Sequence, residues 1–314
     1  MLMVILRRVA MMPPSLLGVS IVIFLLLNVL PGDPLAGLLA PDATQKDREE
    51  LAQRMGLSDP LPVQYVTWMG NVLQGDLGWS FSRRRPIAEL VWTAFGNTVI
   101  LAAAAATIGI AAGVGLGLAA ALRPGGPLDR AVSGFAMVGL SVPNYWLAIL
   151  LIIAFSATLQ WLPAAGMYGP EGGLLDLLAH LLMPSLATAA VSTGLIARMT
   201  RSSILETFGE DFVMLLRAKG LSDLQILRHV LVNAAPPIMT VAGLQVGFLL
   251  GGSVLVETIF SWPGLGQLIF QSISTRDLRL IQASVLVIAV TFVTANLLID
   301  VLQALVNPRL RRAL

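Results

Sequence analysis

Long uncharged apolar runs, separated by short polar segments, dominate this chain. A run of about 18 or more apolar residues can cross the hydrocarbon core of a bilayer as a helix. Six runs meet this length, and they predict an all-α polytopic membrane protein with six transmembrane helices. The expected spans cover roughly residues 9–30, 97–122, 131–160, 177–197, 236–256 and 280–299.

A polar segment over residues 203–235 interrupts this pattern between the fourth and fifth runs. Residues 203–219 have helical character, and Gly220 is typical of a helix end because glycine adopts the left-handed conformation there without strain. Ser222 and Gln225 match a capping box that begins a second helix. The segment therefore predicts a helix–turn–helix with a tight, specified turn.

Several apolar side chains lie within this polar helix–turn–helix, and their exposure to water would be costly. They are Phe212, Leu215, Leu216, Leu221 and Leu224. A solvated loop is the simpler interpretation, but these side chains favour docking into a groove of another protein. We expect the second helix to end near Pro236 and Pro237, because proline interrupts the hydrogen bonds of a helix.

Small residues and prolines mark the predicted spans. Glycines recur every four residues at 109, 113 and 117, and again at 243, 247 and 251, so each set lies on one helix face where backbones approach closely. Ordinary helix packing is the simpler interpretation of these faces, and sliding during a conformational change is the alternative. Pro143 and Pro184 predict local kinks.

No charged residue falls at the centre of a predicted span. Buried carboxylates usually mark ion-coupled transporters and proton relays, so this pattern argues against a secondary transporter. A hydrolase within the membrane, using Ser185 and His180, is disfavoured because residues five apart share a helix face poorly. Four polar residues within or near the spans are candidates for a pore or gate: Asn144, Gln245, Ser253 and Glu257.

The extracytoplasmic segment between the first and second spans is a small cap. Residues 47–55 and 62–73 are expected to be helical, and residues 75–78 to form a turn. Near the gate, residues 257–266 are expected to form an outer re-entrant turn, with Trp262 as an interfacial anchor. The predicted organisation is a first transmembrane helix (1–30), an extracytoplasmic loop region (31–96), a transmembrane core (97–305) that contains the loop 203–235, and a tail (306–314).

Composition narrows the chemistry of the chain. Only 12% of its residues are charged, against about 25% in a soluble domain. The chain contains no cysteine, which excludes a disulfide, a thiolate metal site and a thiol nucleophile. No long basic run is interleaved with aromatic residues, so the lipid bilayer is the expected surrounding and nucleic acid is not an expected partner.

The distribution of lysine and arginine orients the chain. Six spans place both termini on one side, and with that side cytoplasmic, 12 of the 20 basic residues face the cytoplasm. Six of the other eight lie in one long loop, where the positive-inside rule is weak. We therefore expect a multi-pass membrane protein with both termini and the helix–turn–helix in the cytoplasm.

At the helix–turn–helix, the sequence resembles the EAA loop of ABC importer permeases, in the dipeptide, oligopeptide and nickel family and of its first-subunit type. Two features depart from that loop: Leu216 stands where similar loops usually carry a small residue, and the glutamate that names the loop is absent, with Met214 near its place. The resemblance is carried in order along nearly the whole chain by residues 30–34, 56–65, 75–78, 161–163, 197–203, 217–222, 228–229, 233–234, 257–266, 296–300 and 307–309.

The resemblance implies one half of the translocation pathway of an ATP-driven, binding-protein-dependent importer in the bacterial or archaeal cytoplasmic membrane. Its partners would be a second homologous permease subunit, two cytoplasmic ATPase subunits and an extracytoplasmic solute-binding protein. The chain has no G-x-x-x-x-G-K-[ST] phosphate-binding loop, so ATP and Mg²⁺ would bind the partner subunits, and no catalytic, cofactor or metal site is expected here. The residues assigned to ATPase coupling are Asp211, Phe212, Leu215, Leu216, Arg217, Ala218, Lys219, Gly220, Leu221, Ser222 and Asp223.

Di- and oligopeptides are the cargo that the resemblance implies. The same machinery carrying nickel, glutathione or another small solute is the alternative. An ion-coupled secondary transporter is a more distant alternative.

Overall fold

Helices make up nearly all of the computed structural model, which describes residues 2–29, 44–46, 49, 53, 58–169, 172–251 and 253–306. One small antiparallel hairpin, β1 (Trp79–Ser80) with β2 (Arg85–Pro86), corrects the expectation of an all-α chain to a mostly helical one. The helices are α1 (Leu2–Val29), α3 (Leu61–Leu73), α4 (Ile87–Ala121), α5 (Pro127–Ser141), α6 (Asn144–Leu151), the π-helical η1 (Ile152–Thr158), α7 (Leu174–Phe208), α8 (Asp211–Ala218), α9 (Asp223–Gly251), α10 (Val254–Ile259), α11 (Leu265–Ser274) and α12 (Leu278–Val306).

Four helices of the described chain, α4, α7, α9 and α12, are long and apolar enough to cross a membrane. Within α1, residues 9–25 form a shorter apolar stretch. The kink expected at Pro143 within the span over 131–160 is confirmed, and it is sharp, because α5 and the α6–η1 helix meet at an angle of 105°. Val142 is extended at this break, as expected for the residue before Pro143, since the proline ring disfavours helical geometry there.

In the outer loop, α3 confirms the helix expected over 62–73. The expected turn at 75–78 is also confirmed, because Gly75 and Gly78 both have positive φ angles. Most of the helix expected over 47–55 and most of the tail 306–314 lie outside the described residues.

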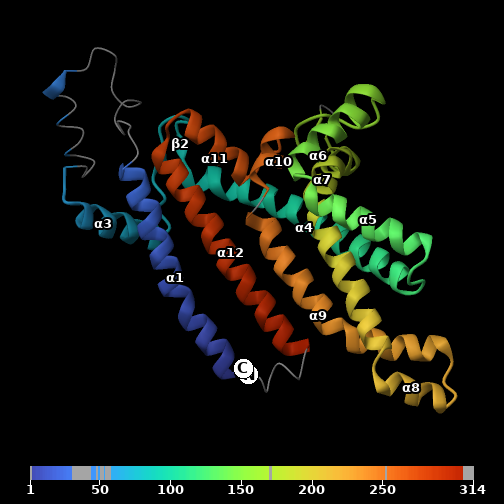
Figure 1. The fold of residues 1–314 in the computed structure, drawn as a ribbon. Coiled ribbons are helices and arrows are strands. Elements are labelled where there is room, and N and C mark those ends of the chain that lie inside the picture. Colours follow the sequence, from blue (N-terminus) through green and yellow to red (C-terminus); the bar gives the residue numbers. More distant parts are fainter. Residues whose placement is uncertain are drawn as a thin grey trace.

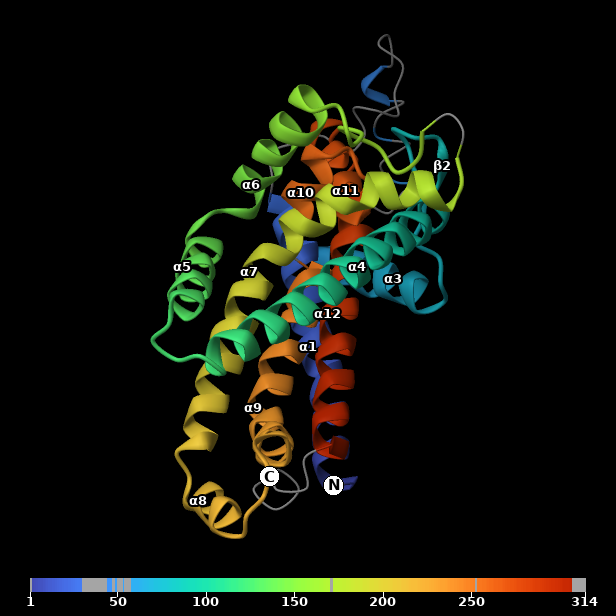
Figure 2. The same ribbon diagram turned by 90° about the vertical axis from the view of Figure 1, so that its right-hand side faces the viewer.

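The glycine face of α4 lies against α7, and the two helices cross obliquely (Figure 2). A Cβ atom added to Gly113 would lie 2.8 Å from the Ile196 side chain, and one added to Gly117 would lie 2.5 Å from the Ala197 carbonyl oxygen. On α9, a Cβ added to Gly247 would meet Asn296 of α12 at 2.8 Å. On α4 the four-residue glycine spacing therefore serves close packing against α7.

Helix α9 passes through Pro236 and Pro237 without ending, so the expected end of the second cytoplasmic helix there is wrong. Ala234, just before the prolines, is buried in an apolar cluster with residues of α4, α7 and α8. Packing on several helices holds α9 together where the prolines remove backbone donors. The second helix of the helix–turn–helix and the fifth predicted span are therefore one helix.

The elements divide between two ends of the molecule (Figures 1 and 2). The start of α1, the end of α12 and the short helix α8 lie at one end. The hairpin strand β2 and helices α6, α10 and α11 lie at the other end. Because α9 joins α8 to α10, it connects the two ends directly.

Candidate functional site

The helix–turn–helix consists of α8 and the first turns of α9. The helix expected over 203–219 is broken: α7 ends at Phe208, and α8 begins at Asp211. Glu210 between them is extended, and its carbonyl oxygen accepts a hydrogen bond from the amide of Val213 at 3.0 Å. The break turns α8 away from the axis of α7 and projects it from the end of the bundle (Figure 1).

The turn after α8 has the geometry that the sequence predicted. Gly220 has a φ of +78°, the left-handed conformation that L side chains rarely adopt. Its amide donates to the Arg217 carbonyl at 2.9 Å, and the amide of Leu221 donates to the Leu216 carbonyl at 3.2 Å. These two bonds form a Schellman motif, which ends the helix and fixes the direction of the following chain.

The capping box at Ser222 is only half formed. The side-chain oxygen of Gln225 accepts a hydrogen bond from the Ser222 amide at 2.9 Å, as expected. The Ser222 hydroxyl donates to the same oxygen at 3.1 Å, so it does not cap the Gln225 amide. Gln225 therefore provides most of the local constraint at the start of α9.

The apolar side chains of the helix–turn–helix divide into two faces. Phe212, Leu216 and Leu221 pack onto a cluster with residues of α4, α7 and α9, so the expectation that they are exposed is wrong. Leu215 and Leu224 do face outward, with exposed fractions of 55% and 77%. Helical periodicity alone did not separate the faces, because the residues that cover the inner face come from distant segments.

A projecting surface results from this division, and it combines apolar and charged groups. Met214, at 72% exposed, joins Leu215 and Leu224 in its apolar part. The remaining coupling candidates on the surface are all exposed: Asp211, Arg217, Ala218, Lys219, Gly220, Ser222 and Asp223. We call this set, with the three apolar residues, the coupling surface.

The four pore and gate candidates do not form one site. Gln245 on α9 accepts a hydrogen bond from the Ser192 hydroxyl of α7 at 3.0 Å. Asn144 is half-buried at the first position of α6, at the sharp bend after α5. Ser253 and Glu257 are both buried near α10, where the Ser253 hydroxyl donates to a Glu257 carboxylate oxygen at 2.6 Å.

Glu257 is fully buried and holds three segments together. One of its oxygens accepts hydrogen bonds from the hydroxyls of Ser253 and Thr98, the latter at 2.9 Å. Its other oxygen accepts from the amides of Gly266 at 2.7 Å and Gln267 at 3.2 Å. Those amides belong to the first turn of α11, where a negative charge is favourable. Glu257 thus joins α4, α10 and α11, a role that its position at a span edge did not reveal.

Trp262 is also fully buried, so the expected interfacial anchor is wrong. Its indole N–H donates to the Asn97 carbonyl of α4 at 2.9 Å, and the Asn97 side chain donates to the Pro263 carbonyl at 2.9 Å. The segment between α10 and α11 is thereby fastened to α4. The expected outer re-entrant turn takes the form of two short helices with a buried linker.

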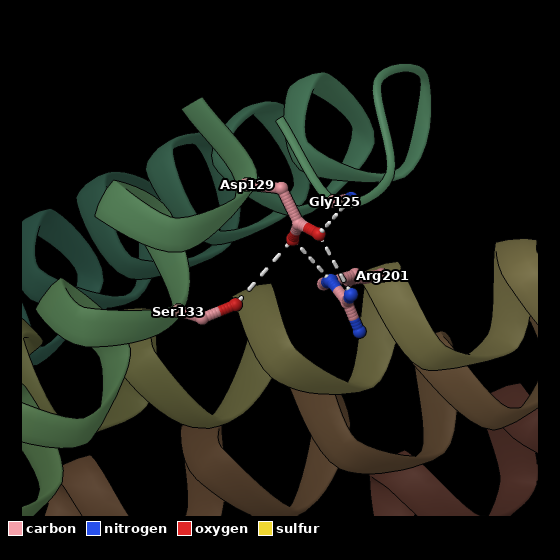
Figure 3. A network of polar contacts seen from close by, with 4 residues as sticks. All are labelled: Gly125, Asp129, Ser133 and Arg201. Atoms are coloured by element: carbon pink, nitrogen blue, oxygen red, sulfur yellow. Dashed lines mark hydrogen bonds and ion pairs between the residues drawn. The ribbon is translucent and has the colours of Figure 1, made fainter. Parts of the chain in front are cut away.

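A partly buried ion pair between α5 and α7 was not predicted. Asp129, in the first turn of α5, pairs with Arg201 of α7 through both of its oxygens (Figure 3). The Asp129 carboxylate also accepts a hydrogen bond from the Gly125 amide at 2.8 Å. In the sequence these residues lie at opposite edges of two predicted spans, and only the packing of α5 on α7 brings them together. The pair fixes α5 to the helix that leads into α8.

Three carboxylates of the described chain, those of Asp129, Glu257 and Asp277, are buried. Each is satisfied by protein donors in its own surroundings. Among the described residues, no group of three or more His, Asp or Glu side chains is arranged to hold a metal ion. The buried acids thus serve as structural links between helices.

The arrangement of long helices around a projecting helix–turn–helix defines a class of protein. A similar arrangement occurs in a solved structure of the MetNI methionine ABC transporter in inward-facing conformations, from its CY5 native crystal form. It matches with a TM-score of 0.56 over 69% of this chain and 96% of that chain, at 20% sequence identity. This likeness shows the ABC importer permease fold.

The sequence then places the chain in a family. Residues 113–312 match the family "Binding-protein-dependent transport system inner membrane component", and residues 1–102 match the corresponding N-terminal family. The chain belongs to this family of inner-membrane permeases. It is therefore a multi-pass ABC transporter permease subunit, a transport component and not an enzyme.

Curated relatives match along nearly the full length of the chain. The glutathione transport system permease protein GsiC of Salmonella choleraesuis is 39% identical over 312 residues, 99% of each chain. The oligopeptide transport system permease protein AppB of Bacillus subtilis is 36% identical over 310 residues, 98% of each chain. The dipeptide transport system permease protein DppB of Alkalihalophilus pseudofirmus is 36% identical, over 97% of this chain and 98% of that protein.

Proposed function

We propose that this chain forms half of the translocation pathway of an ATP-driven importer of di- and oligopeptides. In the assembled importer it pairs with a second, homologous permease subunit. Two cytoplasmic ATPase subunits bind ATP and Mg²⁺, and an extracytoplasmic solute-binding protein delivers the cargo. Six spans cross the membrane in this proposal, with α1 and the bent α5–α6–η1 segment each counted as one.

Both termini are cytoplasmic in this arrangement, on the side of the ATPase subunits. The start of α1 and the end of α12 lie at the same end of the molecule as α8 (Figure 2), which supports this orientation. The excess of lysine and arginine on that side supports it independently.

The coupling surface is the observation that carries the proposal. Met214, Leu215 and Leu224 expose large apolar side chains at the end of the molecule that carries the termini, surrounded by charged residues. An apolar centre with a charged rim is the usual composition of a protein–protein contact. We assign this contact to an ATPase subunit, because this chain has no phosphate-binding loop of its own.

Helix α9 carries the movement of the ATPase subunits to the opposite end. It has 29 residues, which corresponds to about 42 Å at 1.5 Å per residue. Its first turn belongs to the coupling surface, and its last residue directly precedes the segment that contains Ser253 and Glu257. A tilt of α9, driven by ATP binding, would therefore act on α10 and α11 near the proposed outer gate. Asn144 and Gln245 remain proposed pore residues.

The cargo proposal rests on the relatives, two of which are named for oligopeptide and dipeptide transport. Glutathione is itself a small peptide, and the GsiC relatives named for it are 39% identical to this chain. Glutathione is therefore the second candidate cargo. Selectivity in this proposal resides largely in the solute-binding protein.

Replacement of Gly220 by valine tests the coupling role. Valine at a φ of +78° is strained by about 1–3 kcal/mol, so the turn must reopen and the coupling surface must change shape. In proteoliposomes that contain the whole importer and its binding protein, dipeptide uptake per ATP hydrolysed should fall on the order of tenfold. Ionophores are included to dissipate ion gradients, so that the measured uptake is driven by ATP alone.

Gly70→Val is the matched control, because it adds the same side chain to α3 at a position with no atom within 4 Å and no positive φ. This control should transport like the original chain. Unchanged coupling in Gly220→Val would contradict the assignment of the turn. If uptake by the original chain does not require ATP and is abolished by ionophores, the protein is instead a secondary transporter.

A further inference from the structure

A cleft at the end opposite the coupling surface has no role in the mechanism described so far. It has a volume of about 370 Å³ and lies between the β1–β2 turn, the first part of α4 and helix α11. Its polar lining comes from Arg83, Arg85 and Glu89 and from the amide side chains of Asn97, Gln267 and Gln271. Apolar residues, among them Leu90, Ala94 and Leu268, line much of the rest.

The cleft has an excess of positive charge. Arg85 pairs with Glu89 on α4, and both side chains are about half exposed, at 55% and 52%. Arg83 donates only to the neutral side-chain oxygen of Gln271, and no carboxylate of the described chain pairs with it. Its guanidinium is thus held in place by an amide, and its charge has no counterion among the described residues. A ligand with a carboxylate complements this arrangement, because a carboxylate can accept two parallel hydrogen bonds from arginine.

The loop that carries Arg83 is fixed by a buried carboxylate that does not itself line the cleft. Asp277, just before α12, accepts hydrogen bonds from the hydroxyls of Ser80 at 2.6 Å and Ser82 at 2.7 Å. The same carboxylate accepts from the backbone amide of Ser82 at 3.2 Å. The arginine side chains therefore project from a rigid base, which lowers the entropy lost when a partner binds.

The positive surface is larger than the cleft. Arg84 at the tip of the hairpin turn and Arg276 beside Asp277 are both exposed, and neither is among the residues that line the cleft. A single small solute bound in the cleft would leave these two charges unmatched. A flat lipid surface would meet the tip of the turn and leave the hollow empty. A protein loop with acidic residues matches both the hollow and the surrounding charge.

We propose that this cleft receives an acidic side chain, aspartate or glutamate, from a loop of the extracytoplasmic solute-binding protein. The inference rests on the proposed function, which supplies the partner, and it adds the place and the chemistry of the contact. Arg83 binds the incoming carboxylate, and the amide groups of Asn97, Gln267 and Gln271 contact the backbone of the same loop. The floor of the cleft includes Pro263 and Gly264, next to the segment that Glu257 and Trp262 fasten to α4. Binding of this loop would therefore change contacts beside the proposed outer gate.

The test measures docking and uses the whole importer in nanodiscs of neutral lipid. The probe is the solute-binding protein that supports uptake by this importer, and its Kd is measured by biolayer interferometry. Arg83→Glu should weaken this binding on the order of tenfold or more, because like charges then face each other. Arg83→Ala should have a smaller effect in the same direction. Lys46→Glu, an exposed charge reversal in the same outer loop region, should leave the Kd unchanged.

The converse experiment identifies the acidic residue. Each acidic surface residue of the binding protein is changed to arginine, and one such change should restore affinity for Arg83→Glu and weaken it for the original chain. An unchanged Kd in both Arg83 variants would overturn the proposal. So would an effect that appears only with anionic lipid, which would show a membrane contact, or a loss of the second permease subunit on purification, which would show a subunit interface. Failure of the proposed function is a separate result, since no solute-binding protein would then support uptake by the original importer.

Discussion

Gly220 and Glu257 each fix the local structure at one end of the molecule. The role of Gly220 is local, because a left-handed residue after a helix depends only on its neighbours along the chain, and the sequence predicted it. The role of Glu257 depends on partners as distant as Thr98, 159 positions away in the sequence. Its place at a span edge therefore gave no sign that it would be fully buried.

Glu257→Ala should destabilise the permease strongly. The change leaves the amides of Gly266 and Gln267 without acceptors in a buried site, at about 1–3 kcal/mol for each. Glu257→Gln should cost about 1 kcal/mol, since its amide oxygen can still accept from the helix and its NH₂ group can donate to the nearby hydroxyls. Thermal unfolding followed by tryptophan fluorescence would check this order. Equal destabilisation by both changes would show that charge, and not acceptor geometry, determines the role of Glu257.

Helices α4, α5, α7 and α9 show how packing overrides local signals. Prolines differ in their effect on the helix around them: Pro143 lies at the 105° bend between α5 and α6, whereas Pro236 and Pro237 lie within the continuous helix α9. Helix α9 stays continuous because neighbouring helices pack along its length. The Asp129–Arg201 pair acts at the same scale and fixes α5 to α7 (Figure 3).

Gly117→Ala should separate α4 from α7 and destabilise the bundle by about 1–3 kcal/mol, as overpacking does. The added Cβ would lie 2.5 Å from the Ala197 carbonyl oxygen and 2.6 Å from Thr200, so a backbone must move. Gly115→Ala, two residues earlier on the same helix, is the control, because nothing lies within 4 Å of its Cβ position. Heat-induced unfolding of the two purified variants should differ clearly. A similar loss in both would mean that helix flexibility, and not close packing, explains these glycines.

In the proposed function, the two ends of the whole molecule have different tasks, and α9 connects them. Helix α8 lies at the end of the termini, whereas β2 and α11 lie at the other end (Figure 1). The cleft is lined by residues beside β2 and on α11. Buried side chains stabilise the coupling surface and the cleft, so the exposed residues of both sites are available to bind other proteins.

Leu224→Asp and Leu216→Asp distinguish docking from folding. Leu224 is 77% exposed, so aspartate there should leave the permease folded and weaken co-purification of the ATPase subunits, with a loss of about 1–2 kcal/mol typical of an interface residue. Leu216 packs on the inner cluster, so the same change should lower the yield of folded permease instead. Size-exclusion chromatography with subunit quantification separates the two results. Full retention of the ATPase subunits in Leu224→Asp would show that Leu224 does not contribute to binding of the ATPase subunits.

The sequence by itself determined the apolar helices, the helix–turn–helix and the turn at Gly220. These features depend on the hydrophobic length needed to cross a bilayer and on backbone preferences of neighbouring residues, which are encoded locally. The tertiary structure alone decided which of Phe212, Leu215, Leu216, Leu221 and Leu224 face a partner, and it alone joined Glu257 to Thr98 and Asp129 to Arg201. Such contacts join segments far apart along the chain, and only the packing of the helices brings them within hydrogen-bond distance.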